Sequence, residues 1–220
     1  MRFILTYIFL LLSCGSAFAS SCDYSRIIPH EGSELVQIPE HLRPALREGD
    51  RVFLLGIGEF DGASAYRIIS RKGEERVVKF YRRERSLYFD LERFEAIEFV
   101  LQKMKDRGEK PRFRLPKNRR VISPQLLEMD SVRGRAISSI RRQDRLDRLP
   151  ADILRRYRAR WDALIQGFRH QRLLVEDSLK PNEMVAEVYN PVTHRRVMID
   201  LHPGNIVVDS DGDMTIIDPF

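Results

Sequence analysis

Short runs of apolar residues with strand-like spacing dominate the first half of the chain. Arg51–Arg71 predicts two strands around a glycine-rich turn, and Arg76–Tyr81 predicts a third strand. Pro111–Pro124 predicts a loop with a short strand, and Gln125–Ile137 predicts another strand that ends in a turn.

Two segments have the helical spacing of apolar residues instead. Ser86–Arg107 predicts a helix that ends at Gly108. Pro150 is suited to the first turn of a second helix, whose apolar stripe runs to Phe168 and includes Trp161 as a predicted core residue. The arginines of this helix fall outside the stripe: Arg155, Arg156, Arg158 and Arg160. We interpret them as a solvated basic face.

The C-terminal segment combines a polar loop with a hairpin. From Asp200 it reads D-L-H-P-G-N-I-V-V-D-S-D-G-D-M-T-I-I-D-P-F. The apolar runs Ile206–Val208 and Met214–Ile217 flank an acidic glycine turn and predict a hairpin. Asp200 and Asn205 precede the hairpin, and Asp218 follows it. Oxygen atoms of this kind are the ligands that Mg²⁺ prefers.

The wording D-L-H-P-G-N followed by I-D-P resembles the catalytic segment of the protein-kinase-like superfamily, most closely aminoglycoside-phosphotransferase-type and ubiquinone-biosynthesis-type atypical kinases. In kinases a catalytic-loop Asp accepts the proton of the substrate hydroxyl, while an Asn and a later Asp hold magnesium. The resemblance therefore implies Asp200 as the base and Asn205 and Asp218 as metal ligands. The sequence departs from the pattern at Met198, where many kinases have His, and it ends at Phe220 without an activation segment.

The resemblance extends to the nucleotide side of a kinase. Gly56, Gly58 and Gly62 fall where kinases carry a glycine-rich loop over the phosphates, although the spacing here is one residue longer. Lys79 corresponds to the strand lysine that binds the α- and β-phosphates of ATP. Glu95 is the helical carboxylate that we expect to position Lys79.

The strand within Gln125–Ile137 resembles the strand and hinge of phosphotransferase-type kinases. The resemblance implies that backbone groups from Glu128 to Asp130 face the adenine of ATP. Taken without the neighbouring motifs, the same residues are equally explained by an ordinary strand and turn.

A second register of the catalytic motif remains open. Asp177 also precedes an Asn, Asn182, by five positions, and it follows the second predicted helix directly. In that register Asp177 is the base, and Asn182 and Asp200 hold the metal. We prefer the register of Asp200 because its motif wording is closer to the family. Its consequence is an insertion, Asn182–Met198, before the catalytic loop.

Composition limits the compartment and the partners. The chain of 220 residues is 43% hydrophobic and 32% charged, with a net charge of +6, which is typical of a globular protein. Residues 1–19 have the basic start, apolar run and A-x-A site of a signal peptide, with an uncleaved membrane anchor as the alternative. Cleavage would leave Cys22 as the only cysteine, which excludes an internal disulfide. The basic face of the second predicted helix lacks interleaved aromatic residues, so no nucleic-acid partner is predicted.

These observations together predict an α+β protein with a two-lobed protein-kinase-like fold. Its expected parts are a signal peptide (1–19), a leader with one helical turn (20–50), an N-lobe of antiparallel sheet plus one helix (51–130), and a reduced, mostly helical C-lobe (131–220). The predicted function is an exported phosphotransferase that uses ATP and Mg²⁺ and transfers phosphate to a hydroxyl of a protein or a small molecule. The alternative is a pseudokinase that acts as a secreted or surface interaction module. Membrane contact is predicted only through the signal segment.

Overall fold

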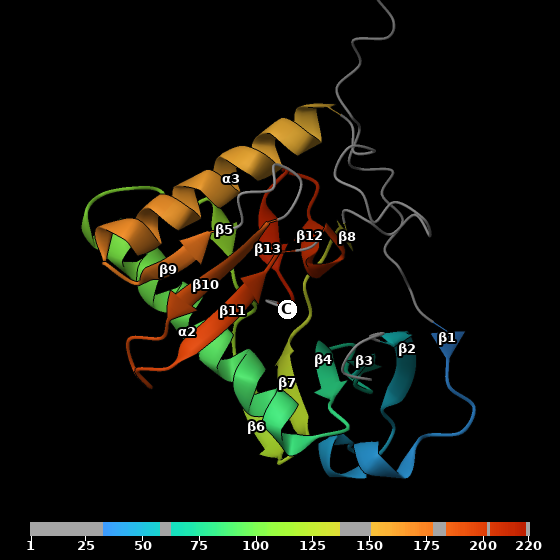
Figure 1. Cartoon of the computed structure of the whole chain (residues 1–220). Coiled ribbons are helices and arrows are strands. Elements are labelled where there is room, and N and C mark those ends of the chain that lie inside the picture. Colours follow the sequence, from blue (N-terminus) through green and yellow to red (C-terminus); the bar gives the residue numbers. More distant parts are fainter. Residues whose placement is uncertain (1–32, 58–62, 137–150, 178–183, 202, 219–220) are drawn as a thin grey trace, which may run out of the picture.

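The computed structural model describes residues 33–57, 63–136, 151–177, 184–201 and 203–218 (Figure 1). The predicted signal peptide lies outside these residues, as do Gly58, Gly62 and Asn182. The fold is α+β, with antiparallel pairing throughout its largest sheet.

The largest sheet has six strands in the order β1-β2-β3-β4-β7-β6. Its strands are β1 (Ser33–Glu34), β2 (Arg51–Ile57), β3 (Ser64–Ile69), β4 (Glu75–Phe80), β6 (Arg120–Ser123) and β7 (Leu126–Asp130). The strands predicted at Arg51–Arg71, Arg76–Tyr81 and Gln125–Ile137 are confirmed, and they are neighbours in this sheet. Pro111–Pro124, predicted as a loop with a short strand, contains two short strands, β6 and the two-residue β5 (Phe113–Arg114).

The segment before β2 belongs to the sheet and is not an extended leader over its described residues. β1 pairs with β2, and a 3-10 helix, η2 (Glu40–Ala45), covers one face of the sheet. Leu42 of η2 is fully buried against apolar side chains that include Val52, Ile68 and Val78. The helical turn predicted within residues 20–50 is therefore present as η2, and the apolar residues of η2 explain why the segment packs on the sheet.

Helix α2 (Glu84–Asp106) lies between this sheet and the rest of the molecule (Figure 1). Leu87 and Phe94 pack toward the sheet, where Leu127 and Met129 of β7 are part of the same apolar cluster. Other apolar residues of α2 belong to a second, larger cluster: Ala96, Ile97, Val100, Leu101 and Met104. Because α2 is buried on two sides, its orientation is determined by both clusters.

The second part of the chain is richer in strands than the sequence predicted. It contains α3 (Ala151–His170), η4 (Pro203–Asn205), β8 (Arg135–Ala136), β9 (Leu174–Asp177), β10 (Val185–Tyr189), β11 (Arg196–Asp200), β12 (Ile206–Val208) and β13 (Met214–Ile216). The described part of 131–220 thus has a single α-helix, and the prediction of a mostly helical lobe is wrong. The predicted insertion, Asn182–Met198, contributes β10 and most of β11, which pair with each other. Alternate residues of both strands are buried, so this segment is part of the core.

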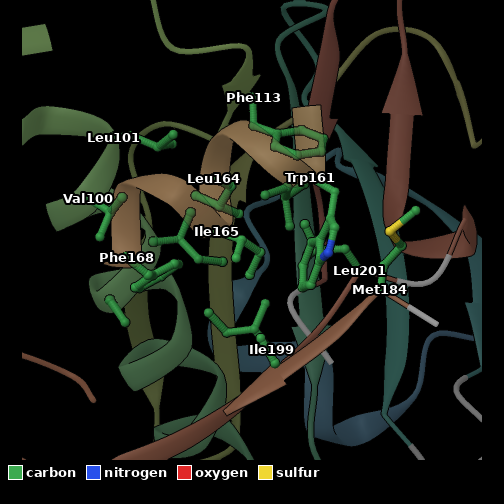
Figure 2. Packing of buried hydrophobic residues seen from close by; sticks show 14 of the residues in the cluster. Val100, Leu101, Phe113, Trp161, Leu164, Ile165, Phe168, Met184, Ile199 and Leu201 are labelled. Atoms are coloured by element: carbon green, nitrogen blue, oxygen red, sulfur yellow. The ribbon is translucent and has the colours of Figure 1, made fainter. Parts of the chain in front are cut away.

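The larger core forms where α2 packs on both α3 and β11, and residues of all three elements belong to it (Figure 2). Trp161, Leu164 and Phe168 of α3 point into it and are almost fully buried. Gly167 allows the two helices to approach closely, since a Cβ at this position would lie 2.5 Å from Cγ1 of Val100. Within the described residues, no helix has the length and apolar character needed to cross a bilayer.

The chain leaves the six-stranded sheet through residues 131–134 and is fixed at once to a hairpin. β8 pairs with β12, and β12 pairs with β13. Gly134 has φ +136°, and a Cβ there would lie 2.3 Å from the carbonyl oxygen of Val208. Only glycine fits this close approach of two backbones.

Replacement of Gly134 by alanine tests this contact. We expect Gly134→Ala to lower the free energy of unfolding by about 1–3 kcal/mol, because a positive φ and a backbone clash both oppose the new methyl group. Gly56→Ala is the matched control: a Cβ at residue 56 meets nothing within 4 Å, and the change should stay below about 1 kcal/mol. Urea unfolding followed by circular dichroism measures both. Equal stability of the two variants would contradict the predicted contact.

Candidate functional site

Lys79 is a buried cation held between two carboxylates. It follows Val78 on β4, and since strand side chains alternate, Lys79 faces α2 whereas Val78 faces η2. Lys79 is only 6% exposed. Nζ donates to Oδ2 of Asp218 at 2.7 Å and lies 3.9 Å from Oδ2 of Asp90. The sequence separation of 139 positions between Lys79 and Asp218 makes this a contact between the two halves of the chain.

Asp90 lies at the centre of the polar cluster. Its Oδ2 accepts a hydrogen bond from the hydroxyl of Tyr81 at 2.7 Å, and its Oδ1 accepts one from Nη1 of Arg93 at 2.8 Å. Burial raises the pKa of the Asp90 carboxyl, and the charge of Asp218 raises it further. Lys79, the Tyr81 hydroxyl and Arg93 act in the opposite direction.

Arg93 extends the cluster to the second part of the molecule. Its Nε donates to the backbone carbonyl of Met198 in β11 at 2.8 Å, while Nη1 contacts Asp90 one helical turn earlier. Arg93 is only 9% exposed. A buried charge is tolerated only when it is paired, so Arg93 must keep its contacts with both Asp90 and Met198. These contacts hold α2 against β11, the strand that ends at Asp200.

The predicted pairing of Glu95 with Lys79 is wrong. Glu95 is exposed, and its Oε2 accepts a hydrogen bond from Nδ2 of Asn190 at 3.2 Å. Asp90 takes the predicted position beside Lys79. The two carboxylates are five residues apart on α2, which corresponds to a rotation of about 140° around the helix axis, so both cannot face Lys79. No sequence motif marks Asp90, and only the orientation of the helix identifies it.

The loop after β11 brings the predicted Asp200, Asn205 and Asp218 into one region. Nδ2 of Asn205 donates to the backbone carbonyl of Asp200 at 3.2 Å. The carbonyl of Asn205 in turn accepts hydrogen bonds from the amides of Ile217 at 2.8 Å and Asp218 at 3.4 Å. These bonds connect the end of β11, the start of β12 and the segment after β13.

Tyr157 of α3 is a residue that the sequence interpretation assigned only to the apolar stripe. Its hydroxyl is buried and has no hydrogen-bond partner among the described residues. Burial raises the pKa of Tyr157, and the negative charge of Asp200 raises it further. The Asp200 carboxylate is therefore close enough for its charge to act on this hydroxyl. No local pattern could have indicated this, because the two residues belong to different elements.

Asp177, the base in the second register, has a different environment. It ends β9, and its Oδ2 pairs with Nη2 of Arg169 on α3 at 3.2 Å. Burial raises the pKa of its carboxyl, while Arg169 lowers it. Its partner in that register, Asn182, lies outside the described residues.

The predicted adenine contact differs from the observed geometry. Glu128 lies within β7 between Val78 of β4 and Arg120 of β6, so its backbone is part of the sheet. The amide of Asp130 donates to the carbonyl of Lys117 at 3.0 Å. Of the predicted glycines, Gly56 lies on β2 with open space above it.

The donor atoms of the site fit Mg²⁺ in type. Asp218 offers a carboxylate, and because the Asn205 amide nitrogen is hydrogen bonded to Asp200, the other end of that amide is an oxygen. Mg²⁺ is commonly held by one or two carboxylates together with substrate phosphates and water. In the described part of the chain, no three His, Cys, Asp or Glu residues group as a metal site on their own.

The chain matches none of the protein-family models and none of the curated proteins with which it was compared. Its function must therefore be inferred from these side chains and their geometry.

The roles of Asp90 and Glu95 can be separated by stability. We expect Asp90→Ala to lower the free energy of unfolding by about 3–5 kcal/mol, because it removes the carboxylate that pairs with the buried guanidinium of Arg93 and lies beside the buried Lys79. Glu95→Ala removes an exposed carboxylate of the same helix and should change stability by less than about 0.5 kcal/mol. Urea unfolding of the two variants measures the difference. A larger loss for Glu95→Ala would show that the helix is rotated relative to this description.

Proposed function

We propose that this protein is a two-lobed, protein-kinase-like phosphotransferase that moves the γ-phosphoryl group of ATP to a hydroxyl with the help of Mg²⁺. The observation that carries the proposal is the contact of Lys79 with Asp218 at 2.7 Å, with Asp90 of the following helix close by. Three residues from separate elements thus meet where a strand lysine, a helix carboxylate and a metal-binding Asp are needed.

The arrangement of the chain supports the same proposal. Lys79 lies on a central strand of an antiparallel sheet, and a single long helix, α2, follows that strand. The chain then passes through residues 131–134 to a second part that carries Asp200, Asn205 and Asp218. In kinases a nucleotide binds in the cleft between two such parts. In this chain Ser131–Arg133, rather than Glu128–Asp130, would be the segment near adenine.

Each side chain then has a defined role. Lys79 would bind the α- and β-phosphates of ATP, and Asp90 would hold Lys79 in position. Asn205 and Asp218 would hold Mg²⁺, which neutralises charge on the phosphate oxygens when bound. Asp200 would accept the proton of the acceptor hydroxyl and orient that hydroxyl toward the phosphate.

The contact of Lys79 with Asp218 has a consequence for ATP binding. To bind ATP, Lys79 would exchange the Asp218 carboxylate for phosphate oxygens, and Asp218 would then be available to hold Mg²⁺. Asp90, at 3.9 Å from Nζ, can keep Lys79 paired during this exchange. Because the side chain of Asp218 is 31% exposed while that of Asp90 is 5% exposed, Asp218 is the more accessible of the two to a ligand.

One observation favours the second candidate function, a pseudokinase that acts as an interaction module. The cluster contains two cations, Lys79 and Arg93, and two carboxylates, Asp90 and Asp218. Its charges are therefore balanced without a ligand, as a purely structural cluster requires. Both candidates include export through the signal segment at residues 1–19.

Nucleotide binding and phosphate transfer distinguish the two. For the purified chain with Mg²⁺ and γ-labelled ATP, we expect ATP binding and release or transfer of the labelled phosphate. Asp200→Asn should reduce turnover by at least about 100-fold while ATP still binds, because it removes only the base. In the Asp218→Asn variant, ATP binding should no longer depend on Mg²⁺.

Asp177→Asn is the matched control, since it changes the base of the second register. Turnover close to that of the unmodified chain is expected for this variant, and its loss would assign the base to Asp177. ATP binding without any transfer would favour the interaction module. Absence of ATP binding would exclude the phosphotransferase.

A further inference from the structure

A strongly basic groove is lined by residues of α3, by residues 109–112 and by the turn that joins β12 to β13, and Lys79 is not part of its lining. Its volume is about 870 Å³. Five cations line it: Lys110, Arg112, Arg155, Arg156 and Arg160. Two carboxylates line it as well, Glu109 and Asp213.

Both carboxylates of the groove are paired with arginines that do not line it. Oε1 of Glu109 lies 2.7 Å from Nε of Arg107, and Oδ2 of Asp213 accepts a hydrogen bond from Nη2 of Arg114. The negative charges near the groove are thus largely neutralised from outside. The five cations therefore keep a net positive charge in the groove.

Two of the arginines converge on one point of the β12–β13 turn. Arg156 and Arg160 are four residues apart on α3 and so share a face of the helix. Nη2 of Arg160 donates to the carbonyl of Gly212 at 2.9 Å. Nη1 of Arg156 lies 3.1 Å from the position that a Cβ on Gly212 would occupy. The turn therefore holds both guanidinium groups close together.

The electrostatics of Arg160 agree with this convergence. Burial lowers the pKa of its guanidinium, and the positive charges of Arg156 and Arg112 lower it further, while Asp213 raises it. Arg112 is the residue immediately before β5, and β5 pairs with β13. Cations thus approach the groove both from α3 and from the segment opposite it.

None of the five cations forms an ion pair with a described carboxylate, and among them only Arg160 forms a side-chain hydrogen bond with a described residue. Lys110, Arg112, Arg155 and Arg156 are exposed and form no ion pair or side-chain hydrogen bond with a described residue. Repulsion among like charges in a concave surface disfavours this arrangement unless an anion is bound.

We propose that this groove binds a small soluble anion that carries several phosphate groups. Arginine binds phosphate through two parallel N–H groups, and several converging arginines suit several phosphates on one molecule. The volume is in the range of small-molecule sites. The apolar part of the lining consists of Met104, Pro111, Ala159 and Ala163, which offers no large pocket for the side chain of a docked peptide. A flat membrane surface would not fill a concave groove.

This anion site is separate from the candidate phosphotransferase site, and it does not depend on that activity. The groove contains the turn end of the β12–β13 hairpin, while Asn205 and Asp218 flank its open end. Each strand has three residues, which corresponds to about 10 Å along the hairpin.

The test is calorimetric titration of the full chain with inorganic tripolyphosphate at low ionic strength, without Mg²⁺. We expect binding, and we expect the double variant Arg112→Gln/Arg156→Gln to weaken it at least about tenfold. Arg47→Gln/Lys72→Gln is the matched control, because it removes the same charge from exposed side chains, one after η2 and one between β3 and β4, that do not line the groove. Its affinity should stay within about twofold of the unmodified chain. Equal melting temperatures show that both double variants are folded.

Three outcomes would overturn the proposal. Unchanged affinity of the groove variant would place the phosphate elsewhere, including beside Lys79. An equal loss in both double variants would indicate a general charge effect. Tighter binding of an acidic peptide of aspartates, or of vesicles with phosphorylated lipid headgroups, with the same dependence on Arg112 and Arg156, would assign the groove to a different partner.

Discussion

The pairing of buried charges around Asp90 is the constraint on which the rest of the structure depends. Lys79, Arg93 and Asp90 are each less than a tenth exposed, and Asp90 contacts both cations, so its removal would take a carboxylate from two buried charges. Their bonds join β4, α2, β11 and the segment after β13. These four elements must therefore take their positions together, because a shift of one would break the ion pairs or hydrogen bonds that connect it to the others.

Helix α2 makes this cluster possible because it is buried on two sides. Phe94 packs toward the six-stranded sheet, while Val100 and Met104 pack toward α3. The polar residues Asp90 and Arg93 lie near the N-terminal half of the helix, where the sheet, β11 and the C-terminal segment meet. The apolar clusters determine the rotation of the helix, and that rotation selects Asp90 over Glu95 as the neighbour of Lys79.

The hairpin of β12 and β13 connects two surfaces of opposite charge. Its open end carries Asn205 and Asp218, whose oxygen atoms suit a cation. Its turn end holds the guanidinium groups of Arg156 and Arg160 beside Gly212, which suit an anion. The backbone contact at Gly134 fixes β12 to the chain that leaves the large sheet. One short element therefore sets the geometry of both proposed sites.

Local sequence patterns determined the strands from residue 51 to 81, helix α2, helix α3 and the C-terminal hairpin, because period and turn composition depend on neighbouring residues alone. They also indicated Lys79 and Asp218 as separate candidates. Tertiary structure decided which carboxylate of α2 meets Lys79, and it placed Tyr157 near Asp200. It also turned Arg160, interpreted as solvated, toward the backbone of Gly212. Each of these contacts joins residues far apart in the sequence, and the rotation of a helix within two apolar clusters is a property of the whole packed chain.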